Sequence, residues 1–206
     1  MKKICYLVLI YIIIVSLYFV YKLNQKPKYN QELFDEIYSQ YENLKDDNIN
    51  SDEKHEISEL NKTNPTFMKV TVQGQEYKVI GKIVIDKINL EYPIIADTTD
   101  ENLKIAPTKL CGPLINTTGN LCIIGHNYIN NKLFSNIPKL QKNDIVTLYD
   151  NNNNSIDYEV YDKYIVNSNN VECLNQNTNN NIEVTLITCT NKNDERLIVK
   201  CQKLDL

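Results

Sequence analysis

The stretch Glu183-Val184-Thr185-Leu186-Ile187-Thr188-Cys189-Thr190 is the part of the sequence from which the fold follows. Its apolar and β-branched residues favour a strand. Residues 191–195 then supply polar turn formers, and Arg196 opens a second apolar run at 197–199. The pattern predicts two strands joined by a short loop, with a cysteine ending the first and an arginine beginning the second.

Cys189 is a candidate nucleophile, because a strand end fixes a thiol while the adjoining loop leaves it open. The attacking species is the thiolate, so the cysteine needs partners. Of the two histidines, His55 lies in a charged, linker-like run and His126 follows the apolar run 121–124. Imidazole can act as an acid or base near neutral pH, and the guanidinium of Arg196 can stabilise an oxyanion.

These motifs resemble those of the sortases, the cysteine transpeptidases of Gram-positive cell surfaces. The resemblance is carried by Thr-Leu-Ile-Thr-Cys at 185–189, by the arginine seven positions later and by Gly-His-Asn at 125–127, and it spans residues 78–203. It implies that Cys189 is the nucleophile and His126 the general acid and base. Arg196 would stabilise the tetrahedral oxyanion.

The resemblance also implies a substrate, namely a surface protein that carries a C-terminal sorting signal similar to Leu-Pro-x-Thr-Gly. The resulting thioacyl-enzyme would be resolved by an amine of a peptidoglycan precursor, of a pilin or of another surface protein. Leu186 and Thr188, beside the cysteine, are predicted to help line the substrate site. Two alternatives stay open: a sortase-like cysteine protease that only hydrolyses, and a non-catalytic surface-binding domain.

Residues 4–21 form an apolar run without Asp, Glu, Lys, Arg, Asn or Gln, which predicts a membrane anchor. Eighteen helical residues reach about 27 Å, enough for one crossing. The run is longer than the core of most signal peptides, and no small-residue cleavage site follows it. Lysines on both flanks leave the orientation open. The resemblance implies a single-pass protein of the cell membrane with an extracellular catalytic domain.

The charge distribution argues against nucleic acid as a partner. Residues 1–28 hold five of the 22 basic residues and no acidic one, which leaves 17 basic against 26 acidic residues, a balance of −9, in the remainder. An acidic domain of this kind is a poor ligand for phosphate backbones.

The chain divides into an anchor with its flanks (1–28), a helical and linker segment (29–66) and a catalytic domain (67–206). Within the second part, 29–47 has helical periodicity and 48–66 is polar and linker-like. One helical face would carry Leu33, Ile37, Tyr41 and Leu44. This helix could pack on the catalytic domain or serve only as a stalk, and it resembles a feature of class B sortases.

The fold class is mainly β, because short strand patterns and turn signals dominate residues 67–206. Composition alone allows an antiparallel barrel or a sandwich. The resemblance implies a closed barrel of about eight strands with short helices.

The six cysteines include one, Cys5, inside the predicted anchor. Cys122 and Cys201 lie in strand patterns and are expected to be small core residues. Cys111 and Cys173 lie in predicted loops, and disulfides are possible in an exported protein. The spacing matches no zinc pattern, and neither a calcium site, another metal nor a cofactor is expected.

Overall fold

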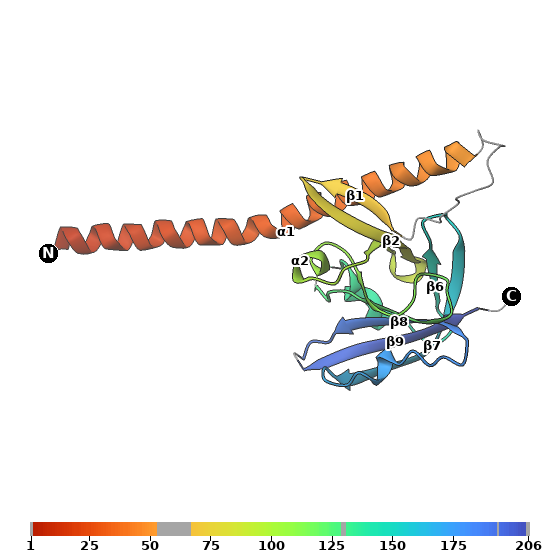
Figure 1. Cartoon of the computed structure of the whole chain (residues 1–206). Coiled ribbons are helices and arrows are strands. Elements are labelled where there is room, and N and C mark those ends of the chain that lie inside the picture. The colour runs from red at the N-terminus through yellow and green to blue at the C-terminus, as the bar shows by residue number, and fades with distance from the viewer. Residues whose placement is uncertain (1, 53–66, 129–130, 193, 205–206) are drawn as a thin grey trace.

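The computed structural model describes residues 2–52, 67–128, 131–192 and 194–204. The predicted linker from 53 to 66, including His55, lies outside the described residues. A long helix leads into a β-barrel (Figure 1). The helices are α1 (Lys2–Asp52), α2 (Asp100–Leu103), η1 (Asp86–Ile88), η2 (Phe134–Lys139) and η3 (Glu172–Leu174). The strands are β1 (Met68–Val72), β2 (Gln75–Ile85), β3 (Leu90–Ile95), β4 (Thr108–Cys111), β5 (Gly119–Ile124), β6 (Ile145–Tyr149), β7 (Ser155–Asn167), β8 (Ile182–Cys189) and β9 (Glu195–Lys203).

The sheet closes on itself, as the resemblance implied. Its strand order is β1-β2-β3-β4-β5-β8-β9-β7-β6, and β2 also pairs with β6. The closed ring therefore contains eight strands, β2 to β9, and β1 is added to the free edge of β2. Closure leaves no open sheet edges around the ring. The prediction of a mainly β, closed barrel of about eight strands is confirmed.

Alternating side chains of the ring strands fill the barrel. In β8, Val184 and Leu186 belong to the interior cluster, whereas Ile187 belongs to a smaller cluster that includes Ile198 of β9. Successive strand residues point to opposite faces. The smaller cluster therefore lies on the outer face of the barrel. Cys173 and Leu174 of η3 pack there against the strands.

Helix α1 packs on the barrel through part of its length (Figure 1). Leu33, Ile37 and Tyr41 are buried together with residues of β1, β2 and β3. Of the two alternatives for this segment, packing on the catalytic domain is the one observed. The prediction that Leu44 continues this face is wrong. The Leu44 side chain is 38% exposed, whereas its neighbour Lys45 is only 4% exposed. An i+4 step from Tyr41 to Lys45 continues the buried stripe better than an i+3 step to Leu44.

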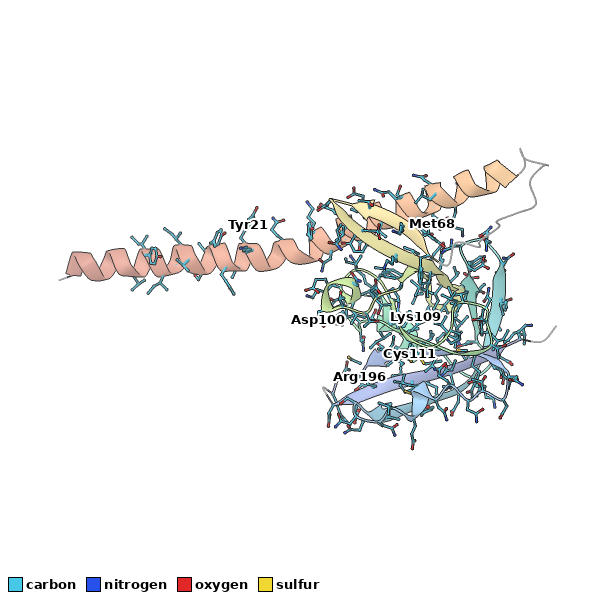
Figure 2. The ribbon with its side chains drawn as sticks, in the orientation of Figure 1. Tyr21, Met68, Asp100, Lys109, Cys111 and Arg196 are labelled. Carbon is cyan, nitrogen blue, oxygen red and sulfur yellow. The ribbon has the colours of Figure 1, made fainter. Side chains whose placement is uncertain are left out.

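The N-terminal part of α1 extends away from the barrel, with Tyr21 on this projecting segment (Figure 2). Its large apolar side chains are exposed between Leu9 and Tyr21. Among the residues that the structure describes, no helix combines the length and apolar character required to cross a membrane.

Candidate active site

The register of β8 and β9 brings Cys189 and Arg196 together. The two residues are direct partners across the antiparallel pair, at the end of β8 and the beginning of β9. Facing partners in such a ladder have Cα atoms about 4.5–5.5 Å apart, with side chains on the same face of the sheet. The short loop 190–194 between them is fastened by Thr190 and Glu195, whose backbone groups are hydrogen-bonded at 3.3 Å.

The segment that carries His126 runs beside the end of β8. β5 pairs in parallel with β8, ending with Ile124 opposite Ile187. Beyond the last strand pair, the Gly125 amide donates to the Ile187 carbonyl at 3.1 Å. The Thr188 hydroxyl donates to the Gly125 carbonyl at 2.8 Å. The backbone of His126 is thereby held next to the residues that precede Cys189.

Asn127 connects this segment to Cys189, the candidate nucleophile, a contact that the sequence reasoning did not assign. Its side-chain amide donates to the backbone carbonyl of Cys189 at 2.8 Å. Asn127 also forms an isolated bridge with Leu133, and the Phe134 amide donates to the His126 carbonyl at 3.0 Å. The sequence signal was present as the third residue of Gly-His-Asn, but nothing in the spacing indicated the partner of its amide.

Gly125 is required by packing rather than by a turn. A Cβ at this position would lie 2.7 Å from the ring of Phe134, which is fully buried. A side chain there would displace the ring or the segment, and His126 is the next residue. The glycine therefore allows the histidine segment to lie close against η2.

Burial and nearby charges shift the pKa of His126. The half-buried ring lies 5.0 Å from the ring of Tyr128, centroid to centroid. Burial lowers the pKa of His126 because it disfavours the imidazolium, and the positive charge of Lys104 lowers that pKa further. The carboxylate of Asp100 acts in the opposite direction. The net effect lowers the pKa of His126. The lower pKa favours the neutral imidazole at neutral pH, and this form can accept a proton from a thiol.

A pocket of about 560 Å³ opens beside the cysteine. Its lining includes Asn127 and the segment 189–191 on one side and the segment 163–165 of β7 on the other. Neither His126 nor Arg196 lines this pocket, so Cys189 is the member of the candidate triad that contributes to its wall. An extended peptide could place an apolar side chain here, because the lining is mostly apolar.

The two predicted substrate-binding residues are shielded from solvent. Leu186 is fully buried in the barrel interior, and Thr188 is fully buried with its hydroxyl bonded to Gly125. Neither lines the pocket. Direct contact of these two side chains with a peptide stays a prediction, and their burial does not favour it.

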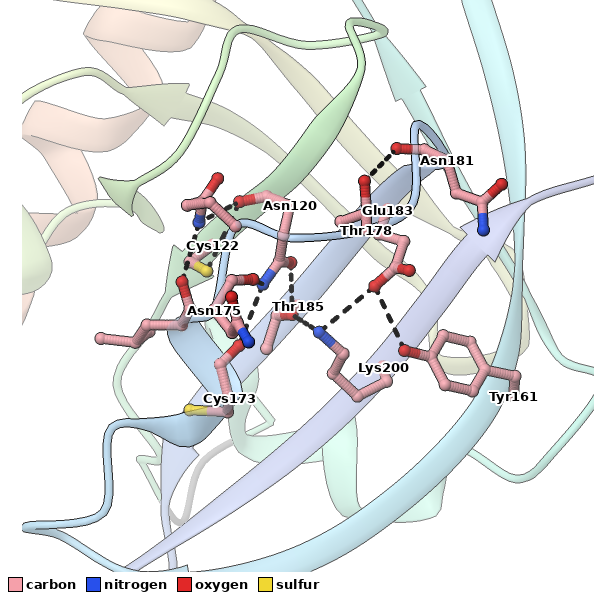
Figure 3. Close-up of polar contacts among 12 residues, drawn as sticks. Asn120, Cys122, Tyr161, Cys173, Asn175, Thr178, Asn181, Glu183, Thr185 and Lys200 are labelled. Carbon is pink, nitrogen blue, oxygen red and sulfur yellow. Dashed lines mark hydrogen bonds and ion pairs between the residues drawn. The ribbon is translucent and has the colours of Figure 1, made fainter.

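A polar network on the outer face connects β5, β8 and β9, the strands of the site, with β7 at a point farther from the cysteine (Figure 3). The Thr185 hydroxyl donates to the Asn120 side-chain oxygen at 2.6 Å and accepts from the Lys200 ammonium at 2.8 Å. Glu183 lies 3.4 Å from that ammonium and accepts from Tyr161. The network joins β5, β8, β9 and β7, so it supports the register on which the site depends.

The described residues contain no group of three or more His, Cys, Asp or Glu arranged to hold a metal ion.

Comparisons with known proteins identify the family. Residues 83–204 match the model of the sortase domain. Sortase A of Bacillus anthracis is 31% identical over 147 residues, which cover 69% of this chain and 69% of that protein. The chain belongs to the sortase family, whose members are cysteine transpeptidases of surface proteins.

Solved structures agree with this assignment. A lid mutant of sortase A from Corynebacterium diphtheriae matches with a TM-score of 0.58 and 28% identity, over 65% of this chain and 74% of that one. Sortase C-1 from Actinomyces oris matches with a TM-score of 0.57 and 27% identity, over 62% of this chain and 75% of that one.

We expect Asn127→Ala to lower kcat/KM about tenfold, because the segment that carries His126 loses its bond to the Cys189 carbonyl. The effect should fall mainly on kcat, and the pH profile should match that of the wild type. Cleavage of a fluorogenic sorting-signal peptide measures both. Asn169→Ala, which changes an exposed asparagine between β7 and β8, is the matched control. An unchanged kcat in Asn127→Ala would contradict the assigned role.

We expect opposite shifts of the His126 pKa when its charged neighbours are removed. Lys104→Gln should raise the pKa because a positive charge near the imidazolium is lost, and Asp100→Asn should lower it because an attraction is lost. The measurement is NMR titration of the ring proton in a His55→Gln background, where His126 is the single histidine. Shifts of the same sign in both variants would refute this electrostatic account.

Proposed function

We propose that this chain is a membrane-anchored transpeptidase that cleaves a sorting signal similar to Leu-Pro-x-Thr-Gly and transfers the product to an amine. The observation that carries the proposal is the pairing of Cys189 with Arg196 at one end of the barrel, beside the segment of His126. Family membership supports the reaction class. The division into anchor (1–28), helix and linker (29–66) and catalytic domain (67–206) is part of the same proposal.

The reaction begins when the Cys189 thiolate attacks the backbone carbonyl of the signal peptide. Arg196, with its fixed fork of donors, stabilises the oxyanion of the tetrahedral intermediate. His126, as imidazolium, gives its proton to the departing amine, and a thioester to Cys189 remains. The acceptor amine then attacks this thioester, with neutral His126 taking the proton from the amine.

The acceptor amine comes from a peptidoglycan precursor, from a pilin or from another surface protein. A peptide bound in extended form would satisfy its backbone along a groove beside Cys189, while side-chain pockets select the motif. The apolar pocket beside Cys189 is a candidate for one such position.

We expect Cys189→Ala to abolish cleavage of a sorting-signal peptide and Arg196→Lys to lower kcat/KM by about 10²-fold, because lysine keeps the charge and loses the fork. The control variant Lys203→Ala, at the exposed end of β9, should leave kcat and KM unchanged. Mass spectrometry with added triglycine should detect the peptide joined to triglycine.

The products also separate the alternatives. Release of the free acid alone, with triglycine present, would support a hydrolase. Equal labelling of the wild type and of Cys189→Ala by a thiol-reactive signal peptide would overturn both catalytic functions and favour a binding domain.

We also propose that the exposed apolar side chains between Leu9 and Tyr21 lie in the cell membrane, with the barrel outside the cell. Their projection from the barrel supports this, because such a surface is unfavourable in water. In fractionated cells, the full chain should remain with the membranes after an alkaline carbonate wash. A chain beginning at Tyr29 should be released. Release of the full chain would refute the anchor.

A further inference from the structure

Two cysteines face each other on neighbouring strands, away from the candidate active site. Cys111 at the end of β4 and Cys122 in β5 are direct partners across the antiparallel pair. Facing Cα atoms in such a ladder are about 4.5–5.5 Å apart. This range lies within the roughly 4.4–6.8 Å that disulfides span.

The two side chains lie on the same side of the sheet, because facing partners of an antiparallel pair do so. Cys111 also packs against the buried cluster that contains Cys122 and Cys173. All five cysteines from Cys111 onward are free in the structure. Formation of a disulfide would replace this contact by a covalent bond with little movement of the backbone.

Accessibility differs between the two partners. Cys111 is half-buried, whereas Cys122 is fully buried and Cys173, which lies in η3, is 7% exposed. Burial raises the pKa of both Cys122 and Cys173. Cys111 is therefore the thiol that a reagent in solution reaches first.

We propose that Cys111 and Cys122 form a redox-active dithiol, which small-molecule disulfides oxidise to an intrachain disulfide between β4 and β5. The proposal does not rest on the catalytic function. A metal site is a weaker explanation, because no group of three or more potential ligands among the described residues is arranged for one.

The exchange balances in two steps. The Cys111 thiolate attacks one sulfur of the small disulfide, forms a mixed disulfide and releases one small thiolate, which takes up the proton that Cys111 lost. The Cys122 thiolate then attacks the Cys111 sulfur and expels the second small thiolate, which takes up the Cys122 proton. Two protein thiols are oxidised to one disulfide, and the small disulfide is reduced to two thiols.

The sequence makes the product easy to locate. Trypsin cuts after Lys109 and Lys132 and has no site between them, so the peptide 110–132 contains both cysteines. Cys173 falls in a different peptide, 164–192, and Cys201 in the peptide 201–203. A Cys111–Cys122 bond is thus internal to one peptide, whereas a Cys122–Cys173 bond joins two peptides.

The experiment uses the reduced full chain with Cys189→Ala, in detergent, incubated with oxidised glutathione. Remaining thiols are alkylated after denaturation, and the chain is digested and weighed. We expect peptide 110–132 to be unalkylated and lighter than its reduced form by two hydrogens, and to regain both thiols with dithiothreitol. Peptide 201–203 should be fully alkylated, because Cys201 is buried in the barrel interior.

A second measurement does not depend on mass. Oxidation should raise the thermal unfolding midpoint by about 5 °C, because the bond closes a loop in the unfolded chain. Cys111→Ser should show no such response. Alkylation of both cysteines after glutathione treatment, glutathione left on Cys111 without ring closure, or a bond from Cys122 to Cys173 would each overturn the proposal.

Discussion

The parallel pairing of β5 with β8 is the constraint on which the candidate site depends. It runs from Gly119 opposite Ile182 to Ile124 opposite Ile187. A slip of one residue would turn every side chain of β8 to the other face. Cys189 would then point into the barrel, and Thr188 would lose the Gly125 carbonyl. Two buried features oppose such a slip: the apolar interior and the outer-face network around Thr185.

This constraint also marks the limit of what the sequence could predict. The end of β8 at Cys189 and the start of β9 near Arg196 followed from local patterns, because a turn separates two apolar runs. The proximity of the His126 segment to Cys189 could not be predicted from local patterns. The two residues are 63 positions apart, and parallel strand pairing leaves no local signal in the sequence. Resemblance to a family supplied that connection, and the roles of the three side chains stay predictions.

Two errors in the sequence interpretation have physical causes. Cys111 was placed in a loop but ends β4, because a strand of four residues followed by Gly112 and Pro113 has too little pattern to detect. Leu44 was placed on the buried face of α1, where Lys45 lies instead. Its ammonium donates to Asn153 at 2.9 Å and lies over the rings of Tyr41 and Tyr149, contacts that no periodicity could reveal.

The docked part of α1 is also held by charge. The Lys82 ammonium lies 3.2 Å from a Glu42 oxygen and 2.7 Å from a Glu91 oxygen, and it is mostly shielded from water. Tyr38 donates to the same Glu91 oxygen at 2.6 Å. Ion pairs of this kind fix orientation more than they add stability. The helix is thus seated in one rotational position on the barrel.

The continuity of α1 has a geometric consequence. Tyr21 and Leu33 are twelve positions apart in one continuous helix, and at 1.5 Å per position they are separated by about 18 Å along its axis. A lipid surface at Tyr21 would therefore lie within about two nanometres of the barrel. If the proposed anchor holds, a helix of that length would keep the barrel close to the lipid surface, and substrates presented near that surface would be within its reach.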